Sequence, residues 1–367
     1  IIKFKVGINY LNIFYGVKEF STDNLKIYLK HKDPLLGWPI KHKNNKLYKQ
    51  YNSIGSRISP ANKLINNKTS ISVYGDSFTF SSDVEHNYAW ANLLAKKLNL
   101  KVLNYGVPGY GVDQAVLKFI NNVNDKSKLV ILGIYPDDIE RNLSQNYSII
   151  ADNELDIFSF KPKFKINQND EIELIQMPIN SLKDANNFIE NYDEFLKNDE
   201  IIHKFNKKLI KPYFPYTLTI IKSLQNFLEK KRGYISKIGL LPDTLPFWIR
   251  NPESLKLNSK IVNLFLKNCE EKNLNCKIMI IPDYTSLSYY QSSGKNINKK
   301  IYENYNWSKH VWDSTTWLAS KMRKPSLCYY LGNSRDCNGH YNIEGNAIIS
   351  NFLYKKIMDN KFLYKNN

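Results

Sequence analysis

The segment Gly75-Asp76-Ser77 can place a serine hydroxyl where it acts as a nucleophile. It follows the apolar run Ile71–Tyr74, whose composition favours a buried strand, and Gly75 permits a sharp turn directly after it. The Asp-Ser pair can begin a helix at the same point. This order would present the Ser77 hydroxyl at the carboxyl edge of a sheet, where open α/β sheets keep their sites. The same residues can also form only a turn and a helix cap, so catalysis requires a base and an oxyanion site as well.

A general base for Ser77 is sought among six histidines. His340 differs from the others because it lies in the polar loop Asn338–Asn342, just before a predicted terminal helix, where a side chain can reach the carboxyl edge of the sheet. The other histidines lie in lysine-rich, amphipathic or loop segments without that position: His31, His42, His86, His203 and His310. His340 is therefore the predicted base.

Strand and helix patterns alternate from about residue 70, and these elements must position the two side chains. Apolar helical faces run through 88–98 and 115–123, and later helices are predicted at 253–273 and Ile343–Met358. Strands beyond the first are predicted at Lys101–Tyr105, Leu129–Ile134, Lys277–Ile281 and Ser326–Leu331. Three βα units in succession imply a parallel, right-handed, doubly wound sheet, and so an α/β fold.

The pattern divides the chain into three parts. Residues 1–69 are polar and irregular and are predicted to wrap around the core as an N-terminal segment. The core comprises 70–142 and 251–367, with an inserted α+β cap at 143–250 that is expected to cover the site and set specificity. Within the cap the sequence predicts a hairpin of Phe158–Ile166 with Glu171–Gln176 and helices near 181–197 and 217–231.

The charge and hydropathy of the chain exclude two classes of partner. The formal net charge is +18, but the 52 basic residues include only six arginines, and the lysines are spread among Asn, Ile and Tyr along the whole length. A nucleic-acid surface would concentrate Arg and Lys on one element, so no nucleic-acid partner is predicted. No run of about 18 apolar residues is present, so no membrane span is predicted. The chain begins at Ile1 without an initiator methionine, which leaves room for a signal peptide or anchor upstream.

The four cysteines fall as two close pairs, Cys269 with Cys276 and Cys328 with Cys337. In an oxidising compartment either pair can form a loop disulfide, and in the cytoplasm all four would be thiols; free thiols are the expectation here. Neither the cysteines nor the histidines cluster at ligand spacings. No metal and no other cofactor is therefore predicted.

Three blocks, in order, resemble those of the SGNH/GDSL hydrolase family. They are Gly75-Asp76-Ser77-Phe78, the bend Gly106-Val-Pro-Gly109 and the segment from His340 to Asn346, and the resemblance covers roughly 70–140 and 275–358. It implies a flavodoxin-like, three-layer α/β fold, with Ser77 as nucleophile and His340 as base. It also implies an oxyanion hole made of the backbone N–H of Ser77, the N–H of Gly106 or Gly109 and an Asn side chain.

The chain departs from the family at the oxyanion Asn. Asp137 or Asp138 occupies its place after the strand that ends at Ile134. An ionised carboxylate beside a developing oxyanion would raise the barrier. Three alternatives remain: the carboxyl is protonated, it points elsewhere while Asn142 or a water substitutes, or the backbone donors act alone.

The chain also departs from the family at the acid that orients the histidine. The family commonly has an Asp three residues before the His, where this chain has Cys337, with Asp336 one residue further away. Either Asp336 reaches His340 through a bulged loop, or the site is a Ser-His dyad whose imidazole is held by a backbone carbonyl.

The resemblance implies a serine-dependent ester hydrolase that removes acyl, especially acetyl, groups from a carbohydrate or glycan through an acyl-enzyme on Ser77. The alternatives are an O-acyltransferase of the same fold in surface-glycan modification and a catalytically impaired glycan-binding relative. The N-terminal segments Asp33–Trp38 and Ser53–Arg57 resemble those of relatives in surface-glycan pathways. The partner is then a small-molecule or glycan ester, and a bacterial periplasm or cell envelope is favoured. Aromatic residues that could stack on a sugar are Trp38, Tyr110, Tyr135 and Trp248.

Overall fold

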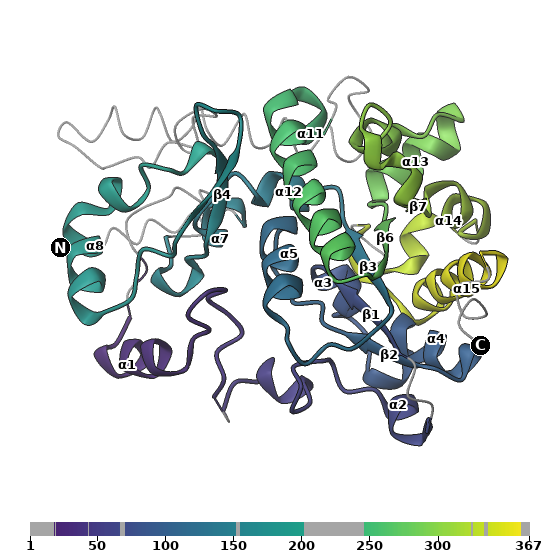
Figure 1. The fold of residues 1–367 in the computed structure, drawn as a ribbon, viewed down its shortest axis with the longest axis horizontal. Coiled ribbons are helices and arrows are strands. Elements are labelled where there is room, and N and C mark those ends of the chain that lie inside the picture. The colour runs from purple at the N-terminus through teal and green to yellow at the C-terminus, as the bar shows by residue number, and fades with distance from the viewer. Residues whose placement is uncertain are drawn as a thin grey trace, which may run out of the picture.

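A computed structural model describes residues 18, 20–42, 44–66, 70–151, 155–201, 246–323, 326–333 and 337–360 of the 367. Its centre is a sheet of five parallel strands in the order β2-β1-β3-β6-β7 (Figure 1). The strands are β1 (Ser70–Tyr74), β2 (Lys101–Asn104), β3 (Leu129–Ile134), β6 (Asn275–Ile280) and β7 (Val311–Asp313). Counted along the chain, this order is the 2-1-3-4-5 order of flavodoxin-like folds, which confirms the predicted doubly wound α/β class.

Both faces of the sheet are buried, because the side chains of each strand alternate between two apolar layers. In β3, Leu132 and Ile134 belong to the core layer formed with α5 (Val112–Asn121) and α12 (Pro252–Glu271). Ile131, the residue before Leu132, belongs to the opposite layer, formed with α4 (Trp90–Leu98) and α15 (Ile343–Asp359). The continuous apolar run of β3 is therefore explained by burial on both sides.

The remaining elements frame this sheet. The helices are α1 (Thr22–His31), α2 (Pro60–Leu64), α3 (Ser77–Phe80), α6 (Asp138–Arg141), α7 (Tyr147–Ile150), α8 (Leu182–Phe195), α11 (Phe247–Arg250), α13 (Tyr284–Ser293) and α14 (Thr315–Lys321). Short 3-10 helices span Tyr48–Gln50, His86–Tyr88, Ile157–Ser159, Ile297–Ile301, Asn306–His310 and Leu327–Tyr330. Two antiparallel hairpins pair β4 (Lys163–Ile166) with β5 (Ile172–Ile175) and β8 (Leu331–Asn333) with β9 (Asn338–Tyr341).

The fifth strand of the sheet differs from the prediction. The predicted strand Ser326–Leu331 is wrong: its residues form a 3-10 helix and enter β8, which pairs with β9 outside the main sheet. The edge position is taken by β7, where Trp312 packs into the core. Three residues with one buried side chain give no periodic signal in a sequence, so this strand was missed.

The N-terminal segment and the inserted region pack against each other. Tyr28 of α1 makes an edge contact with Phe158, and Lys32 donates to the carbonyl of Ile179. Figure 1 shows α1, α8 and the β4–β5 hairpin together on the left, with α14 and α15 on the right. The predicted hairpin and the helix near 181–197 are confirmed, whereas the helix predicted at 217–231 lies outside the described residues. The part boundaries at 69, 142 and 250 stay a prediction.

Both cysteine pairs are disulfides, so the expectation of free thiols is wrong. Cys269 near the end of α12 is joined to Cys276 in β6, and their Cα atoms are 6.2 Å apart. Cys328 is joined to Cys337, directly before β9. In both cases a short connection between two packed elements brings the two thiols together.

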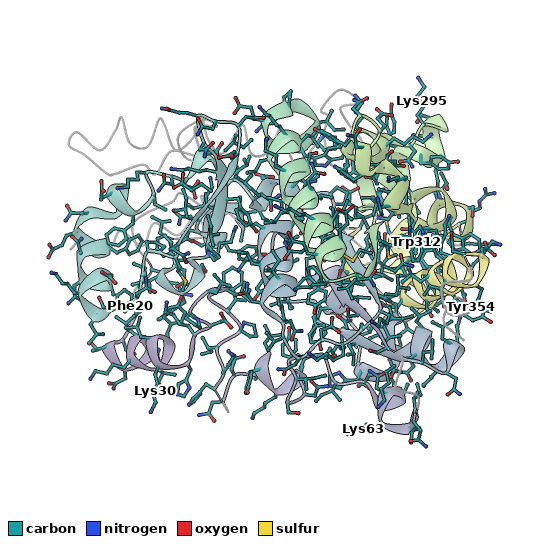
Figure 2. All side chains as sticks on the ribbon, viewed as in Figure 1. Phe20, Lys30, Lys63, Lys295, Trp312 and Tyr354 are labelled. Carbon is teal, nitrogen blue, oxygen red and sulfur yellow. A yellow bond between two sulfur atoms is a disulfide. The ribbon has the colours of Figure 1, made fainter. Side chains whose placement is uncertain are left out.

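Many of the lysines lie on solvated faces, as their even spread in the sequence predicts, whereas Lys161 and Lys163 are buried. Lys30, Lys63 and Lys295 are exposed and lie at widely separated edges of the molecule (Figure 2). Within the described ranges, no helix has the length and apolar character needed to cross a bilayer.

Candidate active site

Ser77 lies at the carboxyl edge of the sheet, at the first position of α3. The chain leaves β1 through Gly75, where a Cβ atom would come within 2.9 Å of the carbonyl oxygen of Gly133 on the neighbouring strand, so only glycine fits this close approach. Asp76 caps the helix by accepting hydrogen bonds from the N–H groups of Phe78 and Thr79, at 2.9 and 3.2 Å. The Ser77 residue is 6% exposed.

His340 lies in β9 and is held by Asp83, a residue of the loop that follows α3. One carboxylate oxygen of Asp83 is 3.0 Å from the Nδ1 atom of His340, and the other accepts the His340 backbone N–H at 2.8 Å. A carboxylate on Nδ1 fixes the imidazole orientation and leaves Nε2 to exchange a proton with a nucleophile. The two hydrogen bonds together give Asp83 the role that the sequence left between Asp336 and a backbone carbonyl.

Gly332 allows this arrangement. A Cβ atom at Gly332 in β8 would collide with the Asp83 carboxylate. A side chain at position 332 would therefore displace the Asp83 carboxylate from its place beside His340.

Aromatic packing brings the histidine to the nucleophile helix. The His340 ring is tilted against the Phe78 ring at a centroid distance of 4.7 Å, and Phe78 directly follows Ser77. Phe78 also stacks on Tyr135 at 3.9 Å and makes an edge contact with Tyr341 at 5.7 Å. The Ser77 hydroxyl donates to Asp76 at 3.3 Å, and in the part of the chain that the structure describes no hydrogen bond joins it to His340. Catalytic hydrogen bonds are often long or misaligned without substrate and tighten in the complex.

Asp336 lies outside the described residues. Sequence reasoning missed Asp83 because it searched for the acid beside the histidine, where the family keeps it. The one available signal was position: Asp83 follows Ser77 by six residues in the loop after the predicted nucleophile turn.

The two glycines predicted for the oxyanion hole differ in whether their backbone N–H groups are already hydrogen-bonded within the protein. The bend lies against the nucleophile turn, since the N–H of Val107 donates to the carbonyl of Gly75 at 3.0 Å. The N–H of Gly106 already donates to the Asn104 side chain. Neither the N–H of Gly109 nor that of Ser77 is hydrogen-bonded to another described residue. Gly109, with φ of +83°, is therefore the better donor of the pair.

The Asp138 carboxylate is bound by neighbouring groups of the protein. It is buried, accepts from the backbone N–H of Tyr135 at 3.3 Å and forms an ion pair with Arg141 at 2.6 Å. The same guanidinium nitrogen lies 3.7 Å from Asp76. Burial and the neighbouring Asp76 raise the pKa of Asp138 well above its ordinary value, since two buried carboxyl groups share one arginine. Arg141, which the sequence did not single out, thus lies beside Asp76, the residue before Ser77.

The Asn142 side chain is hydrogen-bonded within the protein interior. Its carbonyl oxygen accepts the backbone N–H of Asp113 at 3.0 Å and its amide donates to Asn258 at 3.3 Å. Asp137 is partly exposed at the N-terminal end of α6, where its charge acts on Asp283. Of the alternatives for the missing oxyanion Asn, the one that uses backbone donors alone fits this geometry best.

The remaining aromatic and histidine candidates divide by burial. Tyr110 and Trp248 are buried in the core, whereas Trp38 and Tyr135 keep some exposure. Among the other histidines, His86 accepts from Arg57, His310 lies near the Cys276 carbonyl, His31 and His42 pack on each other, and His203 lies outside the described residues. Within the described residues no group of His, Cys, Asp and Glu is arranged to hold a metal ion.

Asp283, at the carboxyl end of β6, is expected to make stability depend on pH. Burial, and then the charge of Asp137, raise its pKa from 3.8 to about 6, so the folded state binds this proton more tightly than the unfolded chain. Its ionisation therefore costs folding free energy above about pH 6, and the cost disappears below about pH 4. Asp283→Asn keeps the helix cap on Ser286 and should raise the free energy of unfolding by about 1–3 kcal/mol near pH 8, with little change near pH 4. Urea titrations at both pH values test this, and an equal change at both would refute it.

The disulfide Cys328–Cys337 is expected to support activity as well as stability, because it anchors the hairpin that carries His340. Replacing both cysteines by serine should cost roughly 2–3 kcal/mol of stability and lower turnover several-fold. The matched control replaces both Cys269 and Cys276 by serine. The disulfide that this control removes closes a loop of similar length, away from the histidine. The control variant should lose comparable stability in urea titrations and keep its turnover. Equal turnover in the two variants would remove the link to His340.

No protein-family model matches this sequence, and comparison with curated proteins finds no match. Among solved structures the chain is similar to a member of the lipolytic G-D-S-L family from Veillonella parvula, at 11% identity and a TM-score of 0.36, covering 79% of this chain and 98% of the other. It is also similar to a catalytic mutant of Axe2, an acetylxylan esterase from Geobacillus stearothermophilus, at 12% identity and a TM-score of 0.37, over 80% and 95% of the two chains. The psychrotrophic esterase EstA from Pseudoalteromonas matches at 12% identity and a TM-score of 0.34, over 80% and 98%. These likenesses are distant, so the function is argued below from the site.

Proposed function

We propose that the protein is a serine ester hydrolase of the SGNH/GDSL type. The observation that carries the proposal is the pair of hydrogen bonds from Asp83 to the ring and backbone nitrogens of His340, which fixes the imidazole against the residue next to Ser77. A serine at a strand-to-helix turn, a histidine and a carboxylate on its far nitrogen are the parts of a nucleophilic triad. The three sequence blocks resembling the family support the same assignment.

The reaction then follows from the positions of the groups. Ser77 Oγ attacks the acyl carbon while His340 takes its proton, and the carbonyl oxygen becomes a tetrahedral oxyanion. The oxyanion accepts hydrogen bonds from the backbone N–H groups of Ser77 and Gly109. His340 then gives the proton to the alcohol oxygen of the ester as the bond between this oxygen and the acyl carbon breaks, which leaves an acyl-enzyme. Water, deprotonated by His340, attacks the acyl-enzyme and releases the acid and Ser77.

We propose an acylated carbohydrate as the substrate. Trp38 and Tyr147, both partly exposed, flank Gly109: a Cβ atom there would lie 3.4 Å from the Tyr147 ring and 3.5 Å from that of Trp38. Trp38 is fixed by donation from its indole nitrogen to the Pro108 carbonyl. A fixed aromatic pair beside the oxyanion donor suits the apolar face of a sugar ring whose ester enters the site.

The proposal is tested by measuring acid release from p-nitrophenyl acetate and from an acetylated oligosaccharide, each with and without an unacetylated sugar acceptor. A hydrolase releases acetate without the acceptor and favours the oligosaccharide. Turnover that requires the acceptor would assign the protein as an O-acyltransferase instead. Absence of turnover in all four reactions would favour a glycan-binding relative without catalysis.

A further inference from the structure

Arg57, from the N-terminal segment, is buried beneath the loop that connects the nucleophile to its acid. Arg57 is only 2% exposed. Its side chain donates hydrogen bonds to three backbone carbonyls of this loop. The acceptors are Phe80, Ser81 at 2.6 Å and Val84 at 2.6 Å. The guanidinium also lies 4.4 Å from the centre of the Phe80 ring. One side chain therefore binds the loop on both sides of Asp83.

The loop requires such support to keep one conformation. Ser81 adopts a left-handed φ of +66°, which is unfavourable for a residue with a side chain. The Asp83 side chain is 36% exposed, so little packing holds its carboxylate. Apart from its two hydrogen bonds to His340, its position depends on the backbone of the loop, and Arg57 binds the carbonyls of Ser81 and Val84 on either side of it.

The chemistry of Arg57 suits a permanent brace. Burial lowers its pKa to about 10, so the guanidinium stays protonated at neutral pH. Its own backbone is anchored to the sheet, because its N–H donates to the carbonyl of Asn104 at the end of β2 at 2.7 Å. Its Nε donates to His86 at 3.3 Å. Lysine has a single ammonium group and cannot span the same carbonyls.

We propose that Arg57 is a positioning residue that holds the Asp83 loop and, through Asp83, sets the orientation of the His340 imidazole. The N-terminal segment then completes the active site without contacting the substrate. This role rests on the proposed function, in which Asp83 and His340 serve Ser77. A purely structural arginine would stabilise the fold without energetic coupling to Asp83.

A double-mutant cycle separates the two roles. Arg57→Ala should lower kcat for p-nitrophenyl acetate about 10- to 100-fold in the wild-type background and less than about twofold in an Asp83→Ala background. Arg57→Lys, which keeps the charge, should lose less than Arg57→Ala and serves in its place if that variant does not fold. The matched control is Lys163→Met, which removes another buried cation bonded to two backbone carbonyls, those of Leu143 and Asn198. Lys163→Met should lower the free energy of unfolding and should change kcat by the same factor in the wild-type and Asp83→Ala backgrounds.

A second measurement does not depend on turnover. The Nδ1 proton of His340, hydrogen-bonded to Asp83, should give a downfield NMR signal that is retained in Lys163→Met and in Ser77→Ala and lost or rapidly exchanging in Arg57→Ala. Equal losses of kcat from Arg57→Ala in both backgrounds, or an unchanged proton signal in that variant, would overturn the inference. If the wild type shows no Ser77-dependent turnover, the proposed function fails, and the proton signal alone still decides whether Arg57 positions the pair.

Discussion

Replacing Ser77 by alanine is expected to lower kcat for ester hydrolysis by about three orders of magnitude or more, because the nucleophile that forms the acyl-enzyme is lost. Binding of substrate should change little, since KM reflects contacts away from the hydroxyl. The fold should be retained, because among the described residues the Ser77 hydroxyl donates a single, long hydrogen bond, to Asp76. Initial rates with p-nitrophenyl acetate over a range of concentrations measure both parameters.

The matched control for this variant is Ser127→Ala. Ser127 is also buried, but its hydroxyl pairs with Ser70 at the opposite end of β1. It should lose a small amount of stability and keep full activity. If Ser77→Ala retained a tenth of the wild-type rate, another group would have to be the nucleophile.

Replacing Asp83 by asparagine is the second change with a large expected effect. The amide keeps the shape of the carboxylate, but it removes the negative charge and can stabilise the wrong tautomer of His340, so kcat should fall by about two to four orders of magnitude. KM should remain within a few-fold of the wild-type value. The same kinetic assay measures both, and urea titration shows whether the variant remains folded.

Asp336→Asn gives the decisive comparison for this role. The resemblance to the family pointed to Asp336 near the histidine, whereas the structure places Asp83 on the backbone N–H and the Nδ1 atom of His340. Asp336→Asn should therefore be close to wild type. If it lost far more activity than Asp83→Asn, the acid would be Asp336 and the contact with Asp83 would be secondary.

The parts of this account that the sequence could predict are those written in local patterns. The continuous apolar run of β3 predicts a buried strand, and the turn at Gly75 is indicated by its residue type and by the strand before it. The order of the helices and strands then determines the flavodoxin-like connection. Ser77 and His340 could be predicted as site residues because each lies directly after or before such an element.

The parts that the sequence could not predict depend on contacts between distant segments. Asp83 and His340 are separated by 257 positions, and nothing in the residues around Asp83 distinguishes it from a surface acid. Arg57 is recognisable only when the loop after α3 is seen to fold over it. The cysteine pairs have spacings compatible with thiols or disulfides, and their pairing follows from how α12 meets β6 and how β8 meets β9.

The short strand β7 shows the same limit at the level of the fold. Trp312 is its one buried side chain, and three residues cannot display the alternation that identifies a strand. The segment Ser326–Leu331 carries a stronger strand-like pattern, but it forms a 3-10 helix that leads into β8, which pairs with β9 outside the main sheet. The segment with the clearer strand-like pattern was therefore predicted as the edge strand of the sheet, although β7 takes that position.

If Ser77 is a nucleophile activated by His340, it should react with a fluorophosphonate. Incubating the folded protein with this reagent and identifying the modified residue by peptide mass spectrometry measures that reaction directly. We expect a single adduct on Ser77 in the wild type, none in Ser77→Ala and labelling at least about 100-fold slower in His340→Ala. Labelling of another residue, or equal rates in the wild type and His340→Ala, would contradict these roles of Ser77 and His340.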